Sequence, residues 1–597
     1  MSEPVTVAAE SAGSLFAAPD IEVIERPDGV RLLSSRTPLG EYASSVGEWL
    51  QKWASAAPDR TFIAERDGEA WTPLSYRDAW STARSIGQAL LDRGLGPDRP
   101  LVVLSGPSIA HAQLMLAAHL VGVPFVPVSV AYSLVVQDPT RVLHIVNQSD
   151  AGLVFVEQSA PFARVLDALS DREIASGDGD VGVALQDLIE TSVTAAVDQA
   201  FSNIEPDHVA KILYTSGSTG MPKGVLTTHR MLCVNQKSMA LVWPFLAETP
   251  PIICDWLPWS HTFGSSHNFN LVLANGGTLY IDGGKPAPGL FDTTVANLAD
   301  VRPTISFNVP AGFARLVDQL ESDSDLADAF FSRLQLIFYA AAPLPEDVWR
   351  RLQAVSIRTT GRVVPMTSSW GLTETAPGVT SAHFPLDRPG VIGTPLPGIT
   401  LKLVPSNDKT EIRVAGPSVT AGYLNDAERS AASFDDEGFL ITGDAVRLAD
   451  PLDPNAGLLF DGRVGEDFKL TTGTWVNVGV LRPQLVSATA PLVLDCVVTG
   501  HGGEQLGLLV WLAPGHEDNA ETRTLLESLL AEHNEANGNT SSTRVRRVVV
   551  LDSPPSIDAG ETTDKGYVNQ GRALLERSQE VERLLADQPD DGVLIIG

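Results

Sequence analysis

Short apolar runs rich in β-branched residues alternate with helical segments along the first two thirds of the chain, and this alternation constrains the fold most. The runs at 101–106, 123–129 and 152–157 are each bounded by turn residues, as strands are. Further runs of this kind follow between residues 211 and 343: KILYTSG, IICDWLP, GTLYIDG, TISFNVP and LQLIFYAAAP. Strands that alternate with helices favour layered α/β architecture with largely parallel sheets.

The pattern changes after about residue 385, where strands punctuated by Gly and Pro replace the alternation. This change predicts a β-rich subdomain over about 385–462, inside a large two-lobed N-terminal domain that covers 21–462 and follows a flexible segment at 1–20. A small, mobile α+β domain is expected over 463–597. Its last segment, ALLERSQEVERLLADQ, has helical spacing that places several apolar residues on one face: Leu574, Leu575, Val581, Leu584 and Leu585.

Charge and composition exclude several classes of protein. Among 597 residues, 42 Lys and Arg stand against 73 Asp and Glu, a formal net charge of −31. Such a chain repels nucleic-acid phosphates and anionic membrane surfaces, so we expect neither as a partner. With 44% hydrophobic residues, the chain has the composition of a globular protein rather than a disordered one.

Cysteine usage and the N-terminus predict a cytoplasmic protein. Cys233, Cys254 and Cys496 are too few and too far apart for a disulfide framework or a CxxC metal site. The first twenty residues lack the basic and apolar regions of a signal peptide. The most apolar stretch, 108–128, contains two His and two Pro residues and predicts a buried helix followed by a strand, not a membrane span.

The most informative motif is Tyr214-Thr-Ser-Gly-Ser-Thr-Gly-Met-Pro-Lys223-Gly224, which follows a predicted strand. Small hydroxyl and glycine residues leave backbone N–H groups free to surround an anion, and Lys223 adds a positive charge. This pattern predicts polyphosphate binding by Thr215, Ser216, Gly217, Ser218, Thr219, Gly220 and Lys223. Because residue 222 is Pro where a Walker loop requires Gly, the motif is not a P-loop. A flexible Ser/Gly surface loop is the alternative.

Further motifs follow in a fixed order: Trp370-Gly371-Leu-Thr373-Glu374, then Thr442-Gly-Asp444, then Gly462-Arg463 with Lys469. Together with the 214–224 run, they resemble the adenylate-forming superfamily of acyl-CoA synthetases, luciferases and peptide-synthetase adenylation domains. The segments DWLPWSHTFGSSHNFN and FDGRVGEDFKLTTGTWVNVG look most similar to the feruloyl-CoA synthetase branch. That resemblance implies an ATP-dependent ligase that joins ferulate or a related hydroxycinnamate to coenzyme A through an acyl-adenylate.

The resemblance also implies nucleotide and metal contacts. Glu374 and Thr215 would hold Mg²⁺, and carboxylate and hydroxyl oxygens suit that ion. Trp370 would stack on adenine, although Tyr is commoner there in the family and a core role is the alternative. Asp444 would accept hydrogen bonds from the ribose hydroxyls, with a turn-forming Asp as the alternative. The remaining nucleotide contacts implied are Ala341, Ala342, Gly371, Thr373 and Arg463.

Catalysis and domain motion are implied for a second group of residues. Lys565 would bind the acid carboxylate and the α-phosphate together, although Thr-Thr-Asp-Lys-Gly departs from the usual family context and a solvated Lys is the alternative. His261 would line the acyl channel. A core histidine is the alternative for His261, and a metal site shared with His267 is disfavoured by the lack of an acidic or cysteine partner. Glu466 would be the hinge, with Gly473 and Lys469 in contact with coenzyme A.

Two other functions remain open: a ligase for another aromatic or medium-chain acid, and a noncatalytic nucleotide-binding homologue. Adenylation without coenzyme A, as in a peptide-synthetase domain or a luciferase-like oxygenase, is a further alternative. We expect the peptide-synthetase form to be weakened because no carrier segment follows Gly597. We expect ATP and coenzyme A as co-substrates and a small aromatic acid as the substrate. A homodimer is one possible oligomeric state.

Overall fold

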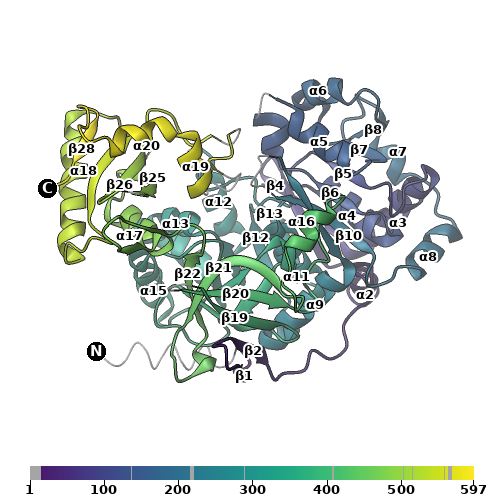
Figure 1. Cartoon of the computed structure of the whole chain (residues 1–597). Coiled ribbons are helices and arrows are strands. Elements are labelled where there is room, and N and C mark those ends of the chain that lie inside the picture. Colours follow the sequence, from purple (N-terminus) through teal and green to yellow (C-terminus); the bar gives the residue numbers. More distant parts are fainter. Residues whose placement is uncertain are drawn as a thin grey trace. The chain divides into compact units, whose positions relative to one another are not determined.

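The computed structural model describes residues 15–135, 138–215, 221–287, 289–406, 409–501, 503–513, 515–556, 559–562 and 568–597 (Figure 1). The chain forms two compact units. Unit 1 comprises Met1–Leu403, Arg413–Ile441 and Leu448–Leu459, and unit 2 comprises Val404–Ile412, Thr442–Arg447 and Phe460–Gly597. Among the described residues, no helix has both the length and the apolar character needed to cross a membrane.

A seven-stranded sheet of unit 1 carries the strands predicted near the N-terminus. Its order is β11(Lys223–Thr228), β10(Val209–Thr215), β6(Phe125–Pro127), β5(Leu101–Val103), β7(Leu153–Val156), β8(Ile174–Ser176) and β9(Val183–Ala184). Neighbouring strands are parallel except β10 and β11, which form an antiparallel hairpin. Every residue of β5, β6 and β7 is buried, so both faces of the sheet are covered, as their continuous apolar sequences require.

Helices surround this sheet, and α4(Ile109–Val121) is the most deeply buried of them (Figure 1). It begins where the Ser108 side chain accepts a hydrogen bond from the His111 N–H, and it ends at Gly122, whose φ of 72° suits a residue without a Cβ atom. The prediction of a buried helix feeding a strand is therefore confirmed. The other helical segments here are α3(Tyr76–Asp92), η1(Ala131–Val135), α5(Thr140–Gln148), α6(Ser159–Ala168), α7(Leu185–Ile189) and α8(Ala195–Ser202).

A four-stranded sheet of unit 1 lies in the order β12(Ile252–Asp255), β13(Thr278–Ile281), β3(Thr61–Asp67) and β4(Ala70–Ser75). The first three strands are parallel and β4 is antiparallel to β3. Between β12 and β13 the chain forms a π-helix, η2(Phe263–Phe269), which leads into a short α-helix. The helices of this region are α2(Val46–Ala56), α9(His229–Val242), α10(Phe245–Glu248) and α11(Asn270–Asn275).

The largest sheet has eleven strands. Its order is β1(Ile21–Glu25), β2(Arg31–Ser35), β19(Thr400–Ser406), β20(Lys409–Ala415), β21(Leu440–Leu448), β22(Leu458–Arg463), β18(Val391–Pro395), β17(Gly378–Ser381), β16(Met366–Gly371), β15(Leu336–Tyr339) and β14(Ile305–Asn308). The strands predicted for a β-rich subdomain thus continue the sheet formed by β14–β17. Its helical segments are α12(Phe291–Val301), α13(Pro310–Ser322), α14(Ser324–Phe331), α15(Glu346–Thr360), η3(Thr373–Thr375), α16(Ala427–Ala432) and η4(Pro454–Ala456).

Unit 2 is built around a separate four-stranded sheet, β25(Val493–Thr499), β26(Leu506–Leu512), β27(Val545–Val550) and β28(Val593–Ile595). One apolar cluster packs this sheet against α17(Val478–Ala488) and α18(Ala520–Ala536), and another packs it against α19(Gln570–Glu576) and α20(Ser578–Leu585). A small hairpin, β23(Phe468–Lys469) and β24(Trp475–Val476), precedes it. This arrangement is the expected α+β domain.

The predicted fold class is confirmed, and two details differ from expectation. The seven- and four-stranded sheets of unit 1 are largely parallel, as expected, but β4, β11, β17 and β18 run antiparallel to a neighbour, so the large sheets are mixed. The predicted C-terminal helix is broken at Arg577, whose guanidinium donates to the buried Glu561 at 2.8 Å. The break leaves Leu575 exposed and Leu584 buried, so these two leucines do not share one buried face.

Lys211 is an unusual residue in the core of unit 1. Its side chain on β10 is completely buried, and its ammonium donates to the Ser265 carbonyl at 3.2 Å. No acidic side chain pairs with it in the described part of the chain, and it interacts electrostatically with the buried imidazoles of His111 and His119. Burial lowers the pKa of Lys211 to about 7.

Replacing Lys211 with methionine is expected to stabilise the protein by about 1–3 kcal/mol at pH 7, because a buried amine gives way to an apolar side chain of similar length. Between pH 7 and about 10.4 an unfolded lysine holds a proton that buried Lys211 has released, so wild-type stability rises with pH. The advantage of Lys211→Met should therefore shrink as pH rises from 7 to 10. Guanidinium unfolding at pH 7, 8.5 and 10 measures this, with the partly exposed Lys237→Met as control; an advantage independent of pH would contradict the assignment.

Candidate nucleotide-binding site

The β10–β11 hairpin presents the predicted phosphate motif. Thr215, the last residue of β10, pairs with Lys223, the first residue of β11, so the intervening segment closes a hairpin rather than joining a strand to a helix. Within the described residues the Thr215 hydroxyl is buried and has no hydrogen-bond partner. The predicted residues Ser216, Gly217, Ser218, Thr219 and Gly220 lie outside the described residues.

Lys223, Glu374 and Tyr423 meet at the base of this hairpin. The Lys223 ammonium lies 3.1 Å from Glu374 Oε1 and donates to the Tyr423 hydroxyl at 2.8 Å. That hydroxyl donates to the same Glu374 oxygen at 2.9 Å. Burial acts to lower the pKa of Lys223, but Glu374 and Tyr423 outweigh it, so the pKa is raised and the lysine stays charged at neutral pH.

Tyr423 is the member of this triad that sequence reasoning missed. Backbone pairing brings it to Lys223: the Leu226 N–H donates to the Gly422 carbonyl, and the Leu424 N–H donates to the Gly224 carbonyl. The Lys223 ammonium also lies 4.2 Å from the centre of the Tyr423 ring. Two hundred residues separate Tyr423 from Lys223, and nothing in the local sequence around it signals this contact.

Glu374 is presented by a tight turn at the end of β16. Gly371 closes the strand, and a Cβ atom at this position would stand 1.8 Å from the Pro377 carbonyl oxygen, which explains the glycine. The turn η3 follows, and the Glu374 carbonyl accepts from the Thr420 N–H at 2.8 Å. Trp370 and Thr373 are both buried in this segment. The sequence motif thus forms one rigid strand–turn unit.

Ala341 and Ala342 follow β15, where the backbone leaves regular geometry. Ala341 has a φ of 77°, a left-handed value that is unfavourable for a residue with a Cβ atom. Strain of this kind is commonly retained at binding sites, so the position is consistent with a functional segment.

His261 precedes the π-helix η2. Its Nδ1 atom accepts a hydrogen bond from the Phe263 N–H at 3.1 Å, so the neutral ring carries its proton on Nε2. The Ser265 N–H donates to the His261 carbonyl at 3.0 Å. The side chain is partly exposed, unlike the fully buried imidazoles of His111 and His119.

In unit 2, Asp444 and Arg463 are paired. Arg463 Nε lies 3.2 Å from Asp444 Oδ1, and Asp444 is almost fully buried on β21. Next to the predicted hinge, Lys409 forms an ion pair with Asp467, and the Glu466 N–H donates to the Arg463 carbonyl at 3.3 Å. Arg463, Glu466 and Asp467 are therefore held by short-range polar contacts within unit 2.

Lys469 and Gly473 belong to the β23–β24 hairpin of unit 2. Gly473 has a φ of 87° in its turn, and its N–H donates to the Leu470 carbonyl at 2.9 Å. The Lys469 ammonium lies 5.9 Å from the Trp475 ring centre on the paired strand. The hairpin thus places both residues on one exposed element. The predicted catalytic Lys565 lies outside the described residues.

The oxygen donors around Glu374 fit a magnesium ion that also binds substrate phosphates. Glu374 Oε1 is engaged by Lys223 and Tyr423, and in the described part of the chain Oε2 has no hydrogen-bond partner. No cluster of three or more His, Cys, Asp or Glu residues that could hold a metal occurs among the described residues. A single carboxylate suits Mg²⁺, which keeps several waters and takes phosphate oxygens as ligands.

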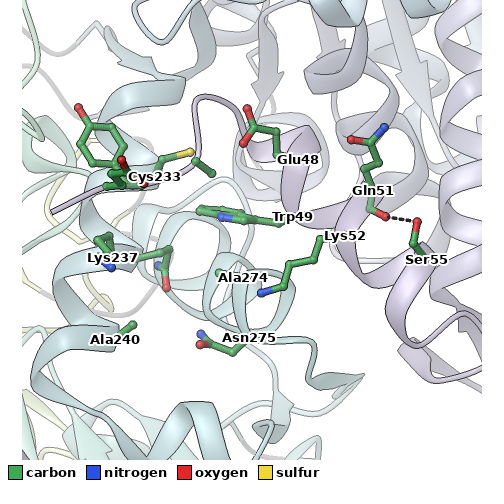
Figure 2. Close-up of a pocket in the computed structure, with 14 residues that line it drawn as sticks. Glu48, Trp49, Gln51, Lys52, Ser55, Cys233, Lys237, Ala240, Ala274 and Asn275 are labelled. Carbon is green, nitrogen blue, oxygen red and sulfur yellow. Dashed lines mark hydrogen bonds between the residues drawn. The ribbon is translucent and has the colours of Figure 1, made fainter.

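A pocket of about 850 Å³ opens elsewhere in unit 1, between α2, α9 and the end of α11. Figure 2 shows Trp49 between Cys233 and Ala274, with Lys52 extending toward Asn275. None of the residues predicted for nucleotide, acid or coenzyme A binding lines this pocket. It is therefore separate from the triad.

Two family models match the chain: "AMP-binding enzyme" over residues 50–424 and "AMP-binding enzyme C-terminal domain" over residues 469–589. Tyrocidine synthase 3 of Brevibacillus parabrevis is 23% identical over 510 residues, which cover 82% of this chain and 7% of that protein. The chain thus spans less than a tenth of the length of the peptide synthetases it matches. A 3-[(3aS,4S,7aS)-7a-methyl-1,5-dioxo-octahydro-1H-inden-4-yl]propanoyl:CoA ligase of Rhodococcus jostii is 25% identical and covers 69% of this chain and 78% of its own length.

Solved structures show the same fold. ATP-bound MatB from Rhodopseudomonas palustris superposes with a TM-score of 0.69 at 24% identity, covering 90% of this chain and 99% of that one. The anthranilate CoA ligase AuaEII, in complex with anthranoyl-AMP, superposes with a TM-score of 0.71 at 19% identity, covering 91% and 98% of the two chains. The fold is thus shared along most of the chain.

Replacing Tyr423 with phenylalanine is expected to lower the free energy of unfolding by about 1–2 kcal/mol, because the hydroxyl bridges Lys223 and Glu374 in a partly buried site. Urea unfolding measures the change. Tyr280→Phe is the matched control: no hydrogen bond from the Tyr280 hydroxyl occurs among the described residues, so we expect less than about 0.5 kcal/mol. Equal losses in both variants would show that the bridge contributes nothing.

Proposed function

The chain belongs to the AMP-binding enzyme family, and from this premise we propose that it activates a carboxylic acid with ATP and transfers the acyl group to coenzyme A. The contact between Lys223, Glu374 and Tyr423 carries the proposal. In this contact, Lys223 supplies a cation for phosphate oxygens and Glu374 supplies a carboxylate oxygen for Mg²⁺. Both belong to segments next to the Ser/Thr/Gly-rich motif that predicts phosphate binding. A noncatalytic homologue would not need both charges held ready in a partly buried position.

In the first half-reaction, a carboxylate oxygen of the acid attacks the α-phosphorus of ATP. The bond between the α-phosphorus and the bridging oxygen breaks, and pyrophosphate leaves with the electron pair. Residues 215–220 and Lys223 bind and orient the departing phosphates. Glu374 and Thr215 would hold Mg²⁺, which supplies charge neutralisation to the triphosphate when bound. Lys565 binds the acid carboxylate and the α-phosphate together and offsets the charge that develops.

The nucleoside is proposed to be held by a second set of residues. Trp370 offers a flat indole for adenine, and the segment of Ala341 and Ala342 offers backbone at close approach. Asp444 accepts hydrogen bonds from ribose hydroxyls, and Arg463 lies beside it, with Nε 3.2 Å from Oδ1. Gly371 and Thr373 complete the contacts.

In the second half-reaction, the thiolate of coenzyme A attacks the acyl carbonyl carbon, and AMP leaves with the electron pair of the broken C–O bond. We propose that unit 2 reorients about Glu466 between the two steps, withdrawing Lys565. Gly473 and Lys469 then contact the pantetheine arm and a phosphate of coenzyme A. His261 lines the acyl channel and orients the adenylate.

We propose a hydroxycinnamic acid such as ferulate as the substrate. The support is the likeness of 255–270 and 460–479 to feruloyl-CoA synthetases, together with fold similarity to an anthranilate CoA ligase. A ligase for another aromatic or a medium-chain acid is the alternative. Adenylation without coenzyme A is the other, and it is favoured by the matches to peptide synthetases.

Acid-dependent exchange of pyrophosphate into ATP tests the first half-reaction. The panel is ferulate, p-coumarate, caffeate, benzoate and octanoate, each with and without coenzyme A. We expect exchange with the hydroxycinnamates at least about tenfold faster than with octanoate, and thioester only when coenzyme A is present. Exchange without thioester would indicate a different acceptor, and no exchange with any acid would refute the enzymatic function.

Lys565→Ala should separate the two half-reactions. Adenylate formation is expected to fall by about two to three orders of magnitude, because the charge that offsets the transition state is lost. Thioester formation from presynthesised acyl-adenylate should stay within about threefold of wild type, because that step does not use the lysine. Equal losses in both steps would contradict its role.

A further inference from the structure

His267 lies at the centre of a buried aromatic cluster in unit 1. Its ring centre is 5.7 Å from that of Phe263, 5.5 Å from Phe307 and 5.1 Å from Phe338, and the three phenylalanines also contact one another. All four rings are at least nine-tenths buried. They come from η2 and from the adjacent parallel strands β14 and β15, so three separate segments of the chain form one apolar cluster.

The hydrogen-bond chain behind His267 determines where its proton lies. The Asn268 side-chain N–H donates to Asp255 Oδ2 at 2.8 Å, so the Asn268 amide oxygen faces the other way. That oxygen lies 2.8 Å from His267 Nδ1, and an amide oxygen can only accept. Nδ1 therefore carries the proton, and Nε2 keeps a free lone pair.

The ring is neutral as well as oriented. Burial lowers the pKa of His267 to about 4, which leaves no proton on Nε2 at physiological pH. Within the described residues, Nε2 is buried and has no hydrogen-bond partner. An unpaired buried acceptor costs about 1–3 kcal/mol, which is a reason to expect that a ligand supplies the missing donor.

We propose that His267 Nε2 accepts a hydrogen bond from a hydroxyl or amino group on the ring of the substrate, so that the enzyme selects aromatic acids that carry such a donor. The inference rests on the proposed function, because it places the acyl group near η2, the helix that follows His261. The three phenylalanines around His267 make its surroundings apolar, as an aromatic ring prefers. A neutral acceptor fixed in one tautomer supplies the polar contact, and a substrate without a donor leaves it unpaired.

The unmodified protein provides the first test, through kcat/KM for pyrophosphate exchange with 3-hydroxy-, 4-hydroxy-, 4-amino-, 4-methyl- and unsubstituted cinnamate. The methyl group matches the hydroxyl and amino groups in size but cannot donate. We expect kcat/KM for 4-aminocinnamate, and for the better of the two hydroxycinnamates, to exceed that for 4-methylcinnamate by about tenfold to a hundredfold. Values within about twofold of one another would overturn the inference, as would a preference for the methyl acid.

His267→Phe removes the acceptor while keeping an aromatic ring. The preference for donor-bearing acids over 4-methylcinnamate should fall to within about twofold, mainly through loss of rate with the donor-bearing acids. His119→Phe is the matched control, since His119 is equally buried and also packs edge-to-face on a phenylalanine, Phe125. This control should keep the wild-type preference, and a loss of preference in both variants would overturn the role of His267.

The outcomes separate the two proposals. If no acid supports exchange, the proposed function fails and the inference fails with it. If exchange occurs with aliphatic acids, or with aromatic acids regardless of their ring substituent, acid activation stands and the role of His267 is refuted. If His267→Phe does not fold, the panel on the unmodified protein decides alone.

Discussion

The contact of Lys223 with Glu374 and Tyr423 is the interaction on which the candidate site depends. It joins the β10–β11 hairpin, the turn after β16 and the Gly422–Leu424 segment, which lie up to 200 residues apart in the chain. A partly buried ion pair is weakly stabilising by itself, because desolvation offsets much of the attraction. Here its main effect is to hold a charged ammonium and a carboxylate together beside the predicted phosphate motif. In that position the ammonium can bind a polyphosphate, and the carboxylate can bind the cation that accompanies it.

Two lysines on one hairpin show how environment, rather than net charge, decides what a cation can do. Lys211 on β10 is buried without a carboxylate, and its pKa falls to about 7. Lys223 on β11 keeps its charge because Glu374 and Tyr423 outweigh its desolvation. The chain carries a net charge of −31, so long-range attraction cannot bring ATP or coenzyme A to it. Under the proposed function, local cations such as Lys223 and Arg463 would have to overcome that repulsion.

Much of the fold followed from local patterns, because buried strands and helices have distinct periods and bounded lengths. The strands at 101–106 and 152–157 and the buried helix before β6 were predicted on that basis. The antiparallel pairs were not, since pairing such as that of β18 with β22 depends on partners distant in sequence. The same limit applies to the site: Thr215, Lys223 and Glu374 belong to recognisable motifs, whereas Tyr423 reaches them only through tertiary pairing. At the break in the C-terminal helix, Arg577 donates to Glu561, a partner that helical spacing does not reveal.

Several unfavourable features of unit 1 fall on the segments assigned to substrate binding. The Thr215 hydroxyl and His267 Nε2 are buried without partners among the described residues, and Ala341 adopts a left-handed backbone. A buried polar atom that truly lacks a partner, or a left-handed alanine, costs folding free energy of the order of 1–3 kcal/mol. A sequence selected for stability alone would remove them, since alanine-to-glycine or histidine-to-phenylalanine changes are available. Buried ring nitrogens without partners among the described residues also occur elsewhere in unit 1, at His111, His119 and His229. On the segments assigned to substrate binding, such features suit a preorganised site, because groups already fixed and unpaired need no rearrangement when a ligand arrives. The folding free energy that such features cost in the free protein then contributes to selective binding, because a ligand that pairs with these groups removes the cost.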